Sequence, residues 1–284
     1  MNFSNEEWSN YFDLWLKEDV GSGDHSSLAS IPRGTNGSSQ LILKEDGVIA
    51  GLELAQALFA HVDEQVIFTP KMKDGEFLKK GTILATAEGP VHSLLVVERL
   101  MLNLMQRLSG VATQTHDLVQ LVGHTGVTLL DTRKTTPGLR LLEKWAVTMG
   151  GGANHRIGLF DMIMLKDNHV DSAGGITTAV NNTREYLRKN NLDLKIEVET
   201  RSLDEVREAI DNKVDRIMFD NFSPDTCKEA VAIVSGRAET EASGGINIDT
   251  LKDYAATGVD YISIGALTHS VKALDISFKT KFKA

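Results

Sequence analysis

The stretch that decides the fold lies at residues 195–220 and reads KIEVETRSLDEVREAIDNKVDRIMFD. Its two ends, 195–199 and 216–220, have the composition of short β-strands, and residues 203–210 between them have a helical pattern. A strand, a helix and a second strand within this length predict a βαβ unit. The two strands of such a unit lie parallel in one sheet, with the helix packed on a face of it.

The same alternation extends from this unit toward both ends of the chain. Further strands are expected at 127–131, 162–166, 239–242 and 261–264. Further helices are expected near 139–149, 176–189, 225–234 and 251–256. Repeated βα units predict a parallel sheet with covering helices, which is either a barrel or an open doubly wound sheet.

Chemically functional residues follow nearly every one of these predicted strands. In chain order they are Arg133 and Lys134, Lys166, Glu199, Asp220, Ser243-Gly244-Gly245, and Gly265-Ala266. The carboxyl ends of all barrel strands face one mouth, where active sites lie. An open doubly wound sheet has a crevice only at its switch point and would not gather all six ends. We therefore favour a barrel.

The first third of the chain has a different rhythm and predicts a small mixed α/β domain. Helices are expected at 4–17, with Ser4 as the N-cap, and at 52–62. Strands are expected at 39–44, 48–51, 66–72 and 81–88. A long helical region follows at 94–121, and we expect Ser109-Gly110 to break or kink it. The basic tail after 278 predicts a solvated end or a segment packed on the N-terminal domain.

Composition restricts the class of protein. The 284 residues carry a formal net charge of -9, with 42% hydrophobic and 24% charged residues, as in a soluble globular protein. The acidic balance argues against general nucleic-acid binding. The single cysteine, Cys227, allows no intramolecular disulfide and suggests a reducing compartment. With no signal peptide at its start and no apolar run of membrane-spanning length, the chain is expected to be cytoplasmic.

A cationic cluster stands out against this acidic background between residues 131 and 169. Its members are Arg133, Lys134, Arg140, Lys144, Arg156 and Lys166, with His155 and His169 among them. Each alone is ordinarily a solvated charge or an ion pair, but together they indicate an anionic ligand with phosphate, pyrophosphate or carboxylate groups. Lys166 could alternatively form a Schiff base. His155 is either a donor to the ligand or a structural histidine.

Glycine turns and carboxylates complete the predicted mouth. The turns Ser243-Gly244-Gly245 and Gly265-Ala266 favour a phosphate site over ordinary tight turns, because both follow the last strands of the pattern. Glu199 and Asp220 fit Mg²⁺, ribose hydroxyls or structural ion pairs equally well. Glu197 points to the same face as Glu199, one layer deeper, and is either its support or the more important residue.

Several common catalytic signatures are missing from the sequence. It holds no serine triad, no zinc-type His/Cys set, no Gly-x-Gly-x-x-Gly turn and no P-loop. The long motifs that it does contain are DTRKTTPGLR at 131–140, GGGANHR at 150–156, KDNH at 166–169, ASGGIN at 242–247 and GVDYISIGALTH at 258–269. GVIAG at 47–51, Glu98-Arg99 and QRLSG at 106–110 extend the pattern into the N-terminal half.

These motifs, in this order, resemble the quinolinate phosphoribosyltransferase family, also called nicotinate-nucleotide pyrophosphorylase (carboxylating). The resemblance implies a pentosyltransferase of NAD biosynthesis. It would join quinolinate to phosphoribosyl pyrophosphate with Mg²⁺ as cofactor, giving nicotinate mononucleotide, pyrophosphate and CO₂. It also implies a sandwich-like N-terminal α/β domain at 1–110, with the tail 270–284 packed on it, and an incomplete α/β barrel at 111–269 that holds the catalytic mouth.

The resemblance also implies a role for each matching residue. Arg99, Arg133, His155 and Arg156 would hold the two carboxylates of quinolinate. Lys134 and Lys166 would meet the pyrophosphate, and Glu199 and Asp220 would hold ribose hydroxyls and the metal, directly or through water. Ser243, Gly244, Gly245, Gly265 and Ala266 would cradle the 5′-phosphate. Arg99 would come from a neighbouring subunit of a homodimer or hexamer.

Three alternative readings can be weighed against this one. A nicotinate phosphoribosyltransferase would bind a monocarboxylate and leave part of the arginine cluster unpaired. A phosphate-binding regulatory protein would bind its ligand without turnover. A related family of molybdenum-cluster proteins shares the fold but tends to lack the full set of quinolinate-binding residues, which this chain has. One departure from the family pattern, His25-Ser26-Ser27 after Asp24, lies outside the motifs and is not expected to alter the chemistry.

Overall fold

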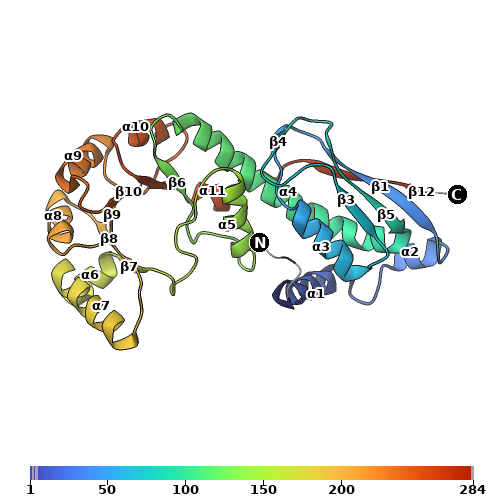
Figure 1. The fold of residues 1–284 in the computed structure, drawn as a ribbon, viewed down its shortest axis with the longest axis horizontal. Coiled ribbons are helices and arrows are strands. Elements are labelled where there is room, and N and C mark those ends of the chain that lie inside the picture. The colour runs from blue at the N-terminus through green and yellow to red at the C-terminus, as the bar shows by residue number, and fades with distance from the viewer. Residues whose placement is uncertain (2, 4–5, 283–284) are drawn as a thin grey trace. The chain divides into compact units, whose positions relative to one another are not determined.

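The computed structural model describes residues 1, 3 and 6–282, and the predicted N-cap Ser4 lies outside them. The chain forms two compact units. The first comprises residues 1–116, 148–150 and 271–284, and the second comprises residues 117–147 and 151–270. We describe each unit by itself (Figure 1).

The first unit is built on a four-stranded antiparallel sheet with strand order β12-β1-β5-β3, accompanied by a two-stranded ribbon of β2 and β4. Its elements are α1 (Glu6–Val20), α2 (His25–Ser30), β1 (Asn36–Leu43), β2 (Gly47–Val48), α3 (Leu52–Val62), β3 (Ile67–Pro70), β4 (Phe77–Leu78), β5 (Ile83–Pro90), the first part of α4 (Val91–Val122) and β12 (Ile276–Phe282). The short helix α2, where Asp24 accepts the amide of Ser27, was not predicted.

The C-terminal tail is a strand of this sheet rather than a solvated end. Strand β12 pairs antiparallel with β1, and the hydroxyls of Ser39 and Thr280 lie 2.8 Å apart. Ile276 and Phe278 point into the core, whereas Lys279 is exposed. Burial of alternate apolar residues therefore holds the tail in place, and lysine on an edge strand opposes further strand pairing.

Helix α4 runs through Ser109 and Gly110 without the predicted break. The hydroxyl of Ser109 accepts the amide of Ala50 at 3.0 Å. A Cβ atom on Gly110 would lie 2.3 Å from the carbonyl oxygen of Lys272. These two residues permit close backbone approach inside the first unit, which explains why residues unfavourable to a helix occur in its middle.

The second unit is a six-stranded parallel sheet with order β6-β11-β10-β9-β8-β7. Its elements are β6 (Thr128–Leu130), α5 (Arg140–Met149), β7 (Ile163–Leu165), α6 (Asp167–Ala173), α7 (Ile176–Asn190), β8 (Ile196–Thr200), α8 (Leu203–Asp211), β9 (Arg216–Asp220), α9 (Pro224–Val234), β10 (Glu239–Ser243), α10 (Leu251–Ala255), β11 (Tyr261–Ser263) and α11 (Ala266–His269). Since β6 and β7 are the two edges of this sheet, the predicted incomplete barrel is confirmed.

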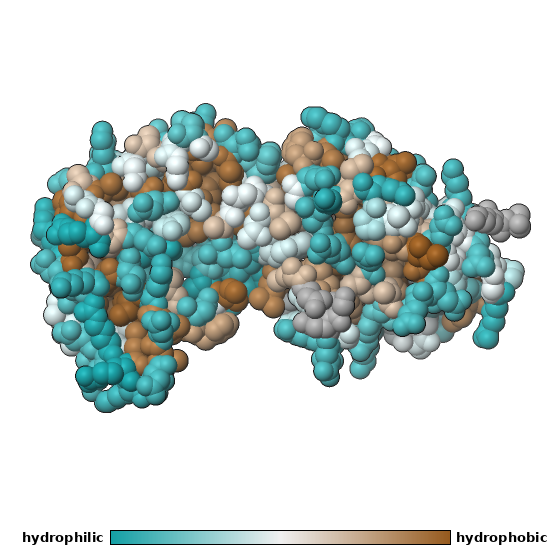
Figure 2. All heavy atoms as spheres, in the orientation of Figure 1, coloured by the Kyte–Doolittle hydropathy of each residue, from teal (hydrophilic) through white to brown (hydrophobic). Residues whose placement is uncertain are grey.

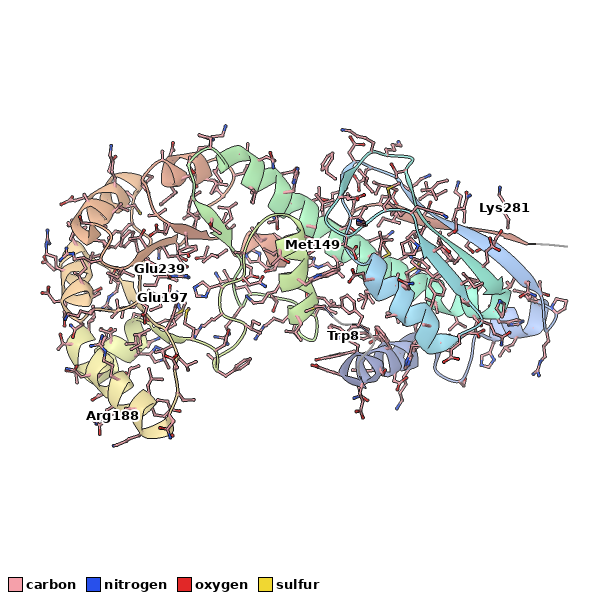
Figure 3. All side chains as sticks on the ribbon, viewed as in Figure 1. Trp8, Met149, Arg188, Glu197, Glu239 and Lys281 are labelled. Atoms are coloured by element: carbon pink, nitrogen blue, oxygen red, sulfur yellow. The ribbon has the colours of Figure 1, made fainter. Side chains whose placement is uncertain are left out.

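Helices α6 to α10 follow the outer side of the curved sheet (Figure 1). The side chains on α7 that face outward are mostly hydrophilic (Figure 2). Strand β8 is buried at every position, and Glu197 lies on it inside the arc of helices, while Arg188 projects from α7 (Figure 3). The sheet thus has an apolar side covered by helices and an inner side where buried charges gather.

The register of the sheet brings the predicted strand ends to one edge. Ser243 lies opposite Asp220, and Glu199 lies opposite Met218 one strand further along. Leu165, the last residue of β7, pairs with Val198 of β8. Lys166 and Glu199 directly follow these two residues in the chain. The carboxyl ends of the strands therefore carry their polar residues at similar heights, as the barrel hypothesis requires.

Candidate functional site

A cavity of about 680 Å³ opens at this edge of the second unit. The predicted site residues that line it are Arg133, Lys134, His155, Arg156, Lys166, Glu199, Asp220, Ser243, Gly244, Gly245, Gly265 and Ala266. Arg99 is exposed on α4 in the first unit and is not one of the lining residues. The cavity therefore collects four cationic side chains, two carboxylates and both glycine turns from seven separate segments of the chain.

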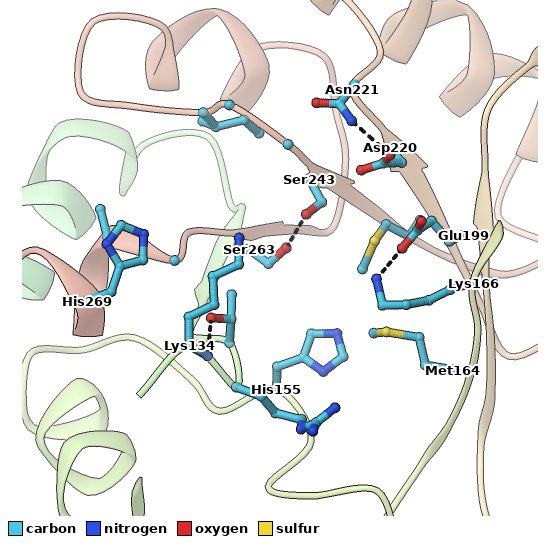
Figure 4. A pocket seen from close by; sticks show the side chains of 18 of the residues that line it. Lys134, His155, Met164, Lys166, Glu199, Asp220, Asn221, Ser243, Ser263 and His269 are labelled. Atoms are coloured by element: carbon cyan, nitrogen blue, oxygen red, sulfur yellow. Dashed lines mark hydrogen bonds and ion pairs between the residues drawn. The ribbon is translucent and has the colours of Figure 1, made fainter. Parts of the chain in front are cut away.

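An ion pair between Lys166 and Glu199 crosses one wall of the cavity (Figure 4). The Lys166 side chain is 45% exposed and that of Glu199 is 9% exposed. The amide of Lys166 donates to Nδ1 of His169, which caps the start of α6. His169 thus has a structural contact, and its backbone partner fixes the point from which the lysine side chain extends.

The end of β9 is locked to the first glycine turn. Asn221, which follows Asp220, has a φ of 56°, and its amide donates to the carbonyl of Ser243 at 2.9 Å. Its side chain donates to Oδ2 of Asp220 at 2.8 Å. A Cβ atom on Gly244 would lie 2.3 Å from Oδ1 of Asn221. Glycine at 244 is therefore required both by the close packing and by its own φ of 98°.

The two glycine turns lie side by side. The hydroxyl of Ser263 donates to that of Ser243 at 3.0 Å, which ties the ends of β10 and β11 together. A Cβ atom on Gly265 would meet the ring of His269 at 3.0 Å and Cδ of Lys134 at 3.1 Å. The absence of a side chain at 265 thus leaves the backbone open to the cavity beside Lys134, as a bound phosphate would need.

The loop that presents Arg133 and Lys134 is held by side chains that do not line the cavity. Arg140 donates to the carbonyls of Arg133 and Ile157 and to the hydroxyl of Thr135. Thr268 donates to the carbonyl of Lys134 at 2.9 Å. The prediction that Arg140 belongs to the ligand-binding cluster is therefore corrected, because its guanidinium group is used to shape this loop.

Lys144 also differs from the prediction. It is buried beneath the cavity and forms an ion pair with Asp131, with side-chain exposures of 2% and 0%. Burial raises the pKa of Asp131 to about 6, against the opposing effect of Lys144, and burial also lowers the pKa of Lys144. A charge on α5 that reads from the sequence as part of a surface cluster is thus a structural element of the interior.

This buried pair positions the segment that carries His155 and Arg156. Asp131 Oδ1 accepts the amide of His155 at 2.9 Å. Lys144 Nζ donates to the carbonyl of the same residue at 2.9 Å. Both backbone groups of His155 are therefore held from one side, which fixes where the next residue, Arg156, enters the cavity.

The ring of His155 has a hydrogen bond at one nitrogen and two buried carboxylates near the other. Nδ1 accepts the amide of Arg156 at 2.7 Å. Nε2 lies 3.2 Å from Oε2 of Glu197 and 3.3 Å from Oε2 of Glu241, out of hydrogen-bond line with either oxygen. His155 lines the cavity, and both ring nitrogens also have neighbours within the protein. The predicted contact between His155 and an acid in the cavity stays a prediction.

Two influences act on the proton of His155 in opposite senses. Burial lowers its pKa, but Glu197 and Glu241 outweigh burial and raise the pKa to about 9. The Arg156 amide, however, can donate to Nδ1 only when that nitrogen carries no proton. We assign one proton, on Nε2, because the amide contact constrains Nδ1 directly and a proton on Nε2 alone already faces both carboxylates.

His155, Glu197 and Glu241 are the one group of three metal-type side chains found within the described residues, with ligand atoms within 4.8 Å of one another. A metal would need the lone pair of Nε2, since Nδ1 is committed to the amide of Arg156. With the proton on Nε2 that lone pair is absent. The group therefore fits a proton-sharing cluster better than a metal centre.

Sequence reasoning missed part of the cavity wall. Thr132, Met164, Met218, Asn221, Ile246, Asn247, Ser263 and His269 also line it. Asn221 directly follows Asp220, and Asn247 is two residues after Gly245, so their position near a strand end was an available signal. Met164 and Met218 look like ordinary strand residues, and only the inward curvature of the sheet reveals them.

Comparisons with known proteins agree with this geometry. The family profile described as Quinolinate phosphoribosyl transferase, C-terminal domain, matches residues 111–279, and that of the N-terminal domain matches residues 24–109. The chain belongs to the quinolinate phosphoribosyl transferase family. It is 45% identical over 282 residues to the chloroplastic nicotinate-nucleotide pyrophosphorylase (carboxylating) of Arabidopsis thaliana, covering 94% of this chain and 80% of that protein.

Two further similar proteins are bacterial. A probable nicotinate-nucleotide pyrophosphorylase (carboxylating) of Bacillus subtilis is 44% identical, covering 94% of this chain and 90% of that protein. The crystal structure of NadC from Streptococcus pyogenes superposes with a TM-score of 0.93 at 40% identity over 98% of both chains. Fold and family therefore agree over most of the chain. No helix in the described part of the chain has the length and apolar character needed to cross a membrane.

Proposed function

We propose that this family member transfers the phosphoribosyl group of phosphoribosyl pyrophosphate to quinolinate with loss of CO₂, giving nicotinate mononucleotide and pyrophosphate for NAD biosynthesis. The observation that carries the proposal is the cavity of about 680 Å³ that gathers cations, carboxylates and two glycine turns. Relatives from Nicotiana are named quinolinate phosphoribosyltransferase (decarboxylating) and share up to 45% identity with the chain. We also propose that the protein lies in the cytoplasm. Plant relatives, by contrast, are named chloroplastic or mitochondrial.

The dicarboxylic acid is proposed to bind at Arg133 and Arg156. Burial lowers the pKa of Arg156, and the neighbouring charge of Arg133 adds to that effect. Two arginines in mutual repulsion are stabilised by an anion between them, and guanidinium groups suit the paired oxygens of a carboxylate. We propose that Arg99 of a second subunit completes this site in a homodimer or hexamer, in keeping with its exposure on α4.

The leaving pyrophosphate is proposed to meet Lys134 and Lys166. As the bond from C1 of the ribose to pyrophosphate breaks, negative charge builds on the leaving group. A lysine stabilises that charge if it is already in place, because no reorganisation is then needed. Lys166 is held near the ligand by Glu199 in the absence of substrate, and the pair can open when the pyrophosphate offers stronger acceptors.

Glu199 and Asp220 are proposed to hold the ribose hydroxyls and Mg²⁺, directly or through water. They offer hard oxygen donors that fit this ion, and the hydrogen bonds described above use one oxygen of each. When bound, Mg²⁺ would neutralise charge on the pyrophosphate. The carboxylates also lie on adjacent strands, so they can hold neighbouring hydroxyls of one ring.

The 5′-phosphate is proposed to bind the turns at Ser243-Gly244-Gly245 and Gly265-Ala266. Both turns lack bulky side chains, and Gly244 and Gly245 have positive φ values of 98° and 64° that expose backbone N–H groups. The tie between Ser243 and Ser263 holds the turns in fixed relation. Binding of this remote phosphate would orient C1 of the ribose toward the acid without taking part in bond breaking.

The chemistry then follows from positioning. The pyridine nitrogen of quinolinate attacks C1 as pyrophosphate leaves, which makes the ring nitrogen cationic. The adjacent carboxylate leaves as CO₂, its bonding electron pair is stabilised by that cationic nitrogen, and a proton from water takes its place on the ring. The cavity needs to supply charge stabilisation and orientation for these steps rather than a dedicated acid or base.

The test is a product assay with purified protein, Mg²⁺ and phosphoribosyl pyrophosphate. Quinolinate should yield CO₂, pyrophosphate and nicotinate mononucleotide in equal amounts, and nicotinate should give little product because it leaves one carboxylate-binding arginine unpaired. Preference for nicotinate would instead indicate a nicotinate phosphoribosyltransferase. Tight binding of both substrates by calorimetry with no CO₂ would assign a binding protein and overturn the proposal.

A further inference from the structure

The buried layer directly beneath the cavity contains charged groups that the proposed reaction does not use. Glu197 on β8 and Glu241 on β10 are fully buried, and both face the ring of His155. Both oxygens of Glu197 and Oε1 of Glu241 lack a directed hydrogen bond to any described group. Burying carboxylates without hydrogen bonds lowers the free energy of unfolding. Their presence at this position therefore suggests a function other than stability.

The cluster has a defined cationic boundary. Arg216 donates to Oε2 of Glu241 at 3.1 Å and to Oε2 of Glu239 at 3.0 Å, and its guanidinium lies 4.1 Å from the ring centre of Tyr261. Arg216 therefore fixes Glu241 from the side away from the histidine. Another side of the cluster faces Nε2 of His155, which lies within 3.3 Å of an oxygen of each carboxylate.

A chain of contacts leads from these glutamates to the substrate cavity. A proton kept on Nε2 leaves Nδ1 free to accept, and Nδ1 accepts the amide of Arg156 at 2.7 Å. The opposite tautomer would set an N–H group against the amide N–H and push the two apart. The side chain of Arg156 lines the cavity and also donates to the carbonyl of Met162 at 3.3 Å. The glutamates can thus determine where this arginine stands.

We propose that Glu197 and Glu241 are positioning residues: their negative charges, 3.2 and 3.3 Å from Nε2, favour the Nε2–H tautomer of His155. That tautomer leaves Nδ1 to anchor the Arg156 amide, which aims the Arg156 guanidinium at the acid. The inference rests on the proposed function for the identity of the acid. It assigns His155 a role through Arg156 rather than through contact with the ligand. It also explains why Glu197, one layer below Glu199, is buried and acidic.

The first test reads the tautomer without using activity. Protein labelled with ¹⁵N at its histidine rings is examined at pH 7, and the signals of His155 are assigned by comparison with the His155→Gln variant. The expected spectrum shows a protonated Nε2 and an unprotonated Nδ1. Protons on both nitrogens, a proton on Nδ1 alone, or a shift of Nε2 on adding Zn²⁺ would each overturn the proposal.

The second test uses the Glu197→Gln and Glu241→Gln variants, with Glu239→Gln as the matched control. Glu239 also pairs with Arg216 but does not contact His155. The two test variants should raise KM for quinolinate by about 10²-fold while kcat falls far less, because a displaced arginine weakens acid binding. The control should leave KM and the ring signals unchanged. A KM unchanged in the test variants, or raised equally in the control, would overturn the proposal.

A third comparison separates positioning from direct contact and from loss of folding. His155→Asn places an amide oxygen near the Nδ1 position, whereas His155→Gln places its amide near Nε2. KM for quinolinate in each of these variants is compared with that of His155→Phe, which offers neither nitrogen. A KM restored by Asn alone supports the anchoring of Arg156. A KM restored by Gln alone supports direct contact with the acid and overturns the proposal. If every variant fails to fold, the tautomer of His155 in the wild-type protein still tests the proposal. Wild-type turnover of quinolinate tests the proposed function separately.

Discussion

Two layers of charge in the second unit are built from the same residue types but in opposite ways. In the cavity wall, Lys166 is paired with Glu199 while 45% of the lysine side chain is exposed. In the layer beneath, Lys144 is paired with Asp131 while the two side chains are 2% and 0% exposed. One pair is open to exchange with a ligand, and the other is not.

The difference shows how this fold separates recognition from support. A substrate phosphate is proposed to replace Glu199 as the partner of Lys166, because both groups line the cavity and the lysine side chain is 45% exposed. Asp131 is fully buried, and its Oδ1 accepts from both Lys144 and the amide of His155. The lower layer therefore fixes the backbone from which the upper layer reaches into the cavity, and the two layers should respond differently to mutation.

Removal of Asp131 is expected to have the largest effect. Asp131→Ala leaves the Lys144 ammonium buried without its partner and should lower the free energy of unfolding by about 3–5 kcal/mol. Urea denaturation followed by the fluorescence of Trp145, with Trp8 and Trp15 changed to Phe, measures this value. Lys189→Ala, which breaks the exposed pair with Glu185 on α7, should cost less than about 1 kcal/mol. Equal costs would contradict the assignment of the layers.

Removal of Lys166 should affect turnover rather than stability. Lys166→Ala removes a cation proposed to stabilise the leaving pyrophosphate, so kcat should fall by about 10²–10³-fold. The unfolding midpoint should stay close to that of the wild type, because the lysine is half exposed. Rates of CO₂ release and urea curves for this variant and for Lys189→Ala provide the measurement. A drop in stability with unchanged kcat would reverse the roles proposed for the two layers.

The pH dependence of stability should report the lower layer. Burial raises the pKa of Asp131 from 3.8 to about 6, so between these values the folded state binds more protons than the unfolded state. The stabilising contribution of this group is then present at pH 4 and is lost as pH rises through 6, by up to about 3 kcal/mol. Unfolding free energies of wild type and Asp131→Asn from pH 4 to 7 test it, and parallel curves would refute it.

The smallest of these effects is expected at the proposed metal carboxylates of the upper layer. Asp220→Asn should raise the Mg²⁺ concentration needed for half-maximal activity by about 10- to 100-fold, because a neutral amide is a weaker ligand. Asp225→Asn, at an exposed position on α9 that does not line the cavity, is the matched control. A Mg²⁺ requirement that moves equally in both variants would argue against a metal at Asp220.

Much of the upper layer could be predicted from the sequence. Strand β9 and helix α3 have the predicted bounds, and the residues after each predicted strand line one cavity, because parallel strands share one carboxyl edge. The depth of Glu197 relative to Glu199 also followed from the two-residue period of a strand. Position along a strand is a local property, so local pattern is sufficient to predict it.

The lower layer could not be predicted, because its partners meet only in the folded chain. Lys144 lies between Glu143 and Trp145 and has no sequence feature that distinguishes it from a surface lysine. The contact of His155 with Glu241 joins residues far apart in the chain. Helices α6 and α11 were missed for another reason: they are shorter than the window over which helical periodicity is visible.

The most direct test of the two-layer account is a crystal structure with quinolinate and an unreactive phosphoribosyl pyrophosphate analogue bound. The account predicts that Lys166 leaves Glu199 and contacts the pyrophosphate, while Lys144 stays on Asp131 and the Arg156 amide stays on Nδ1 of His155. A complex in which the Lys166–Glu199 pair persists, or in which the buried pair opens to admit the ligand, would contradict it.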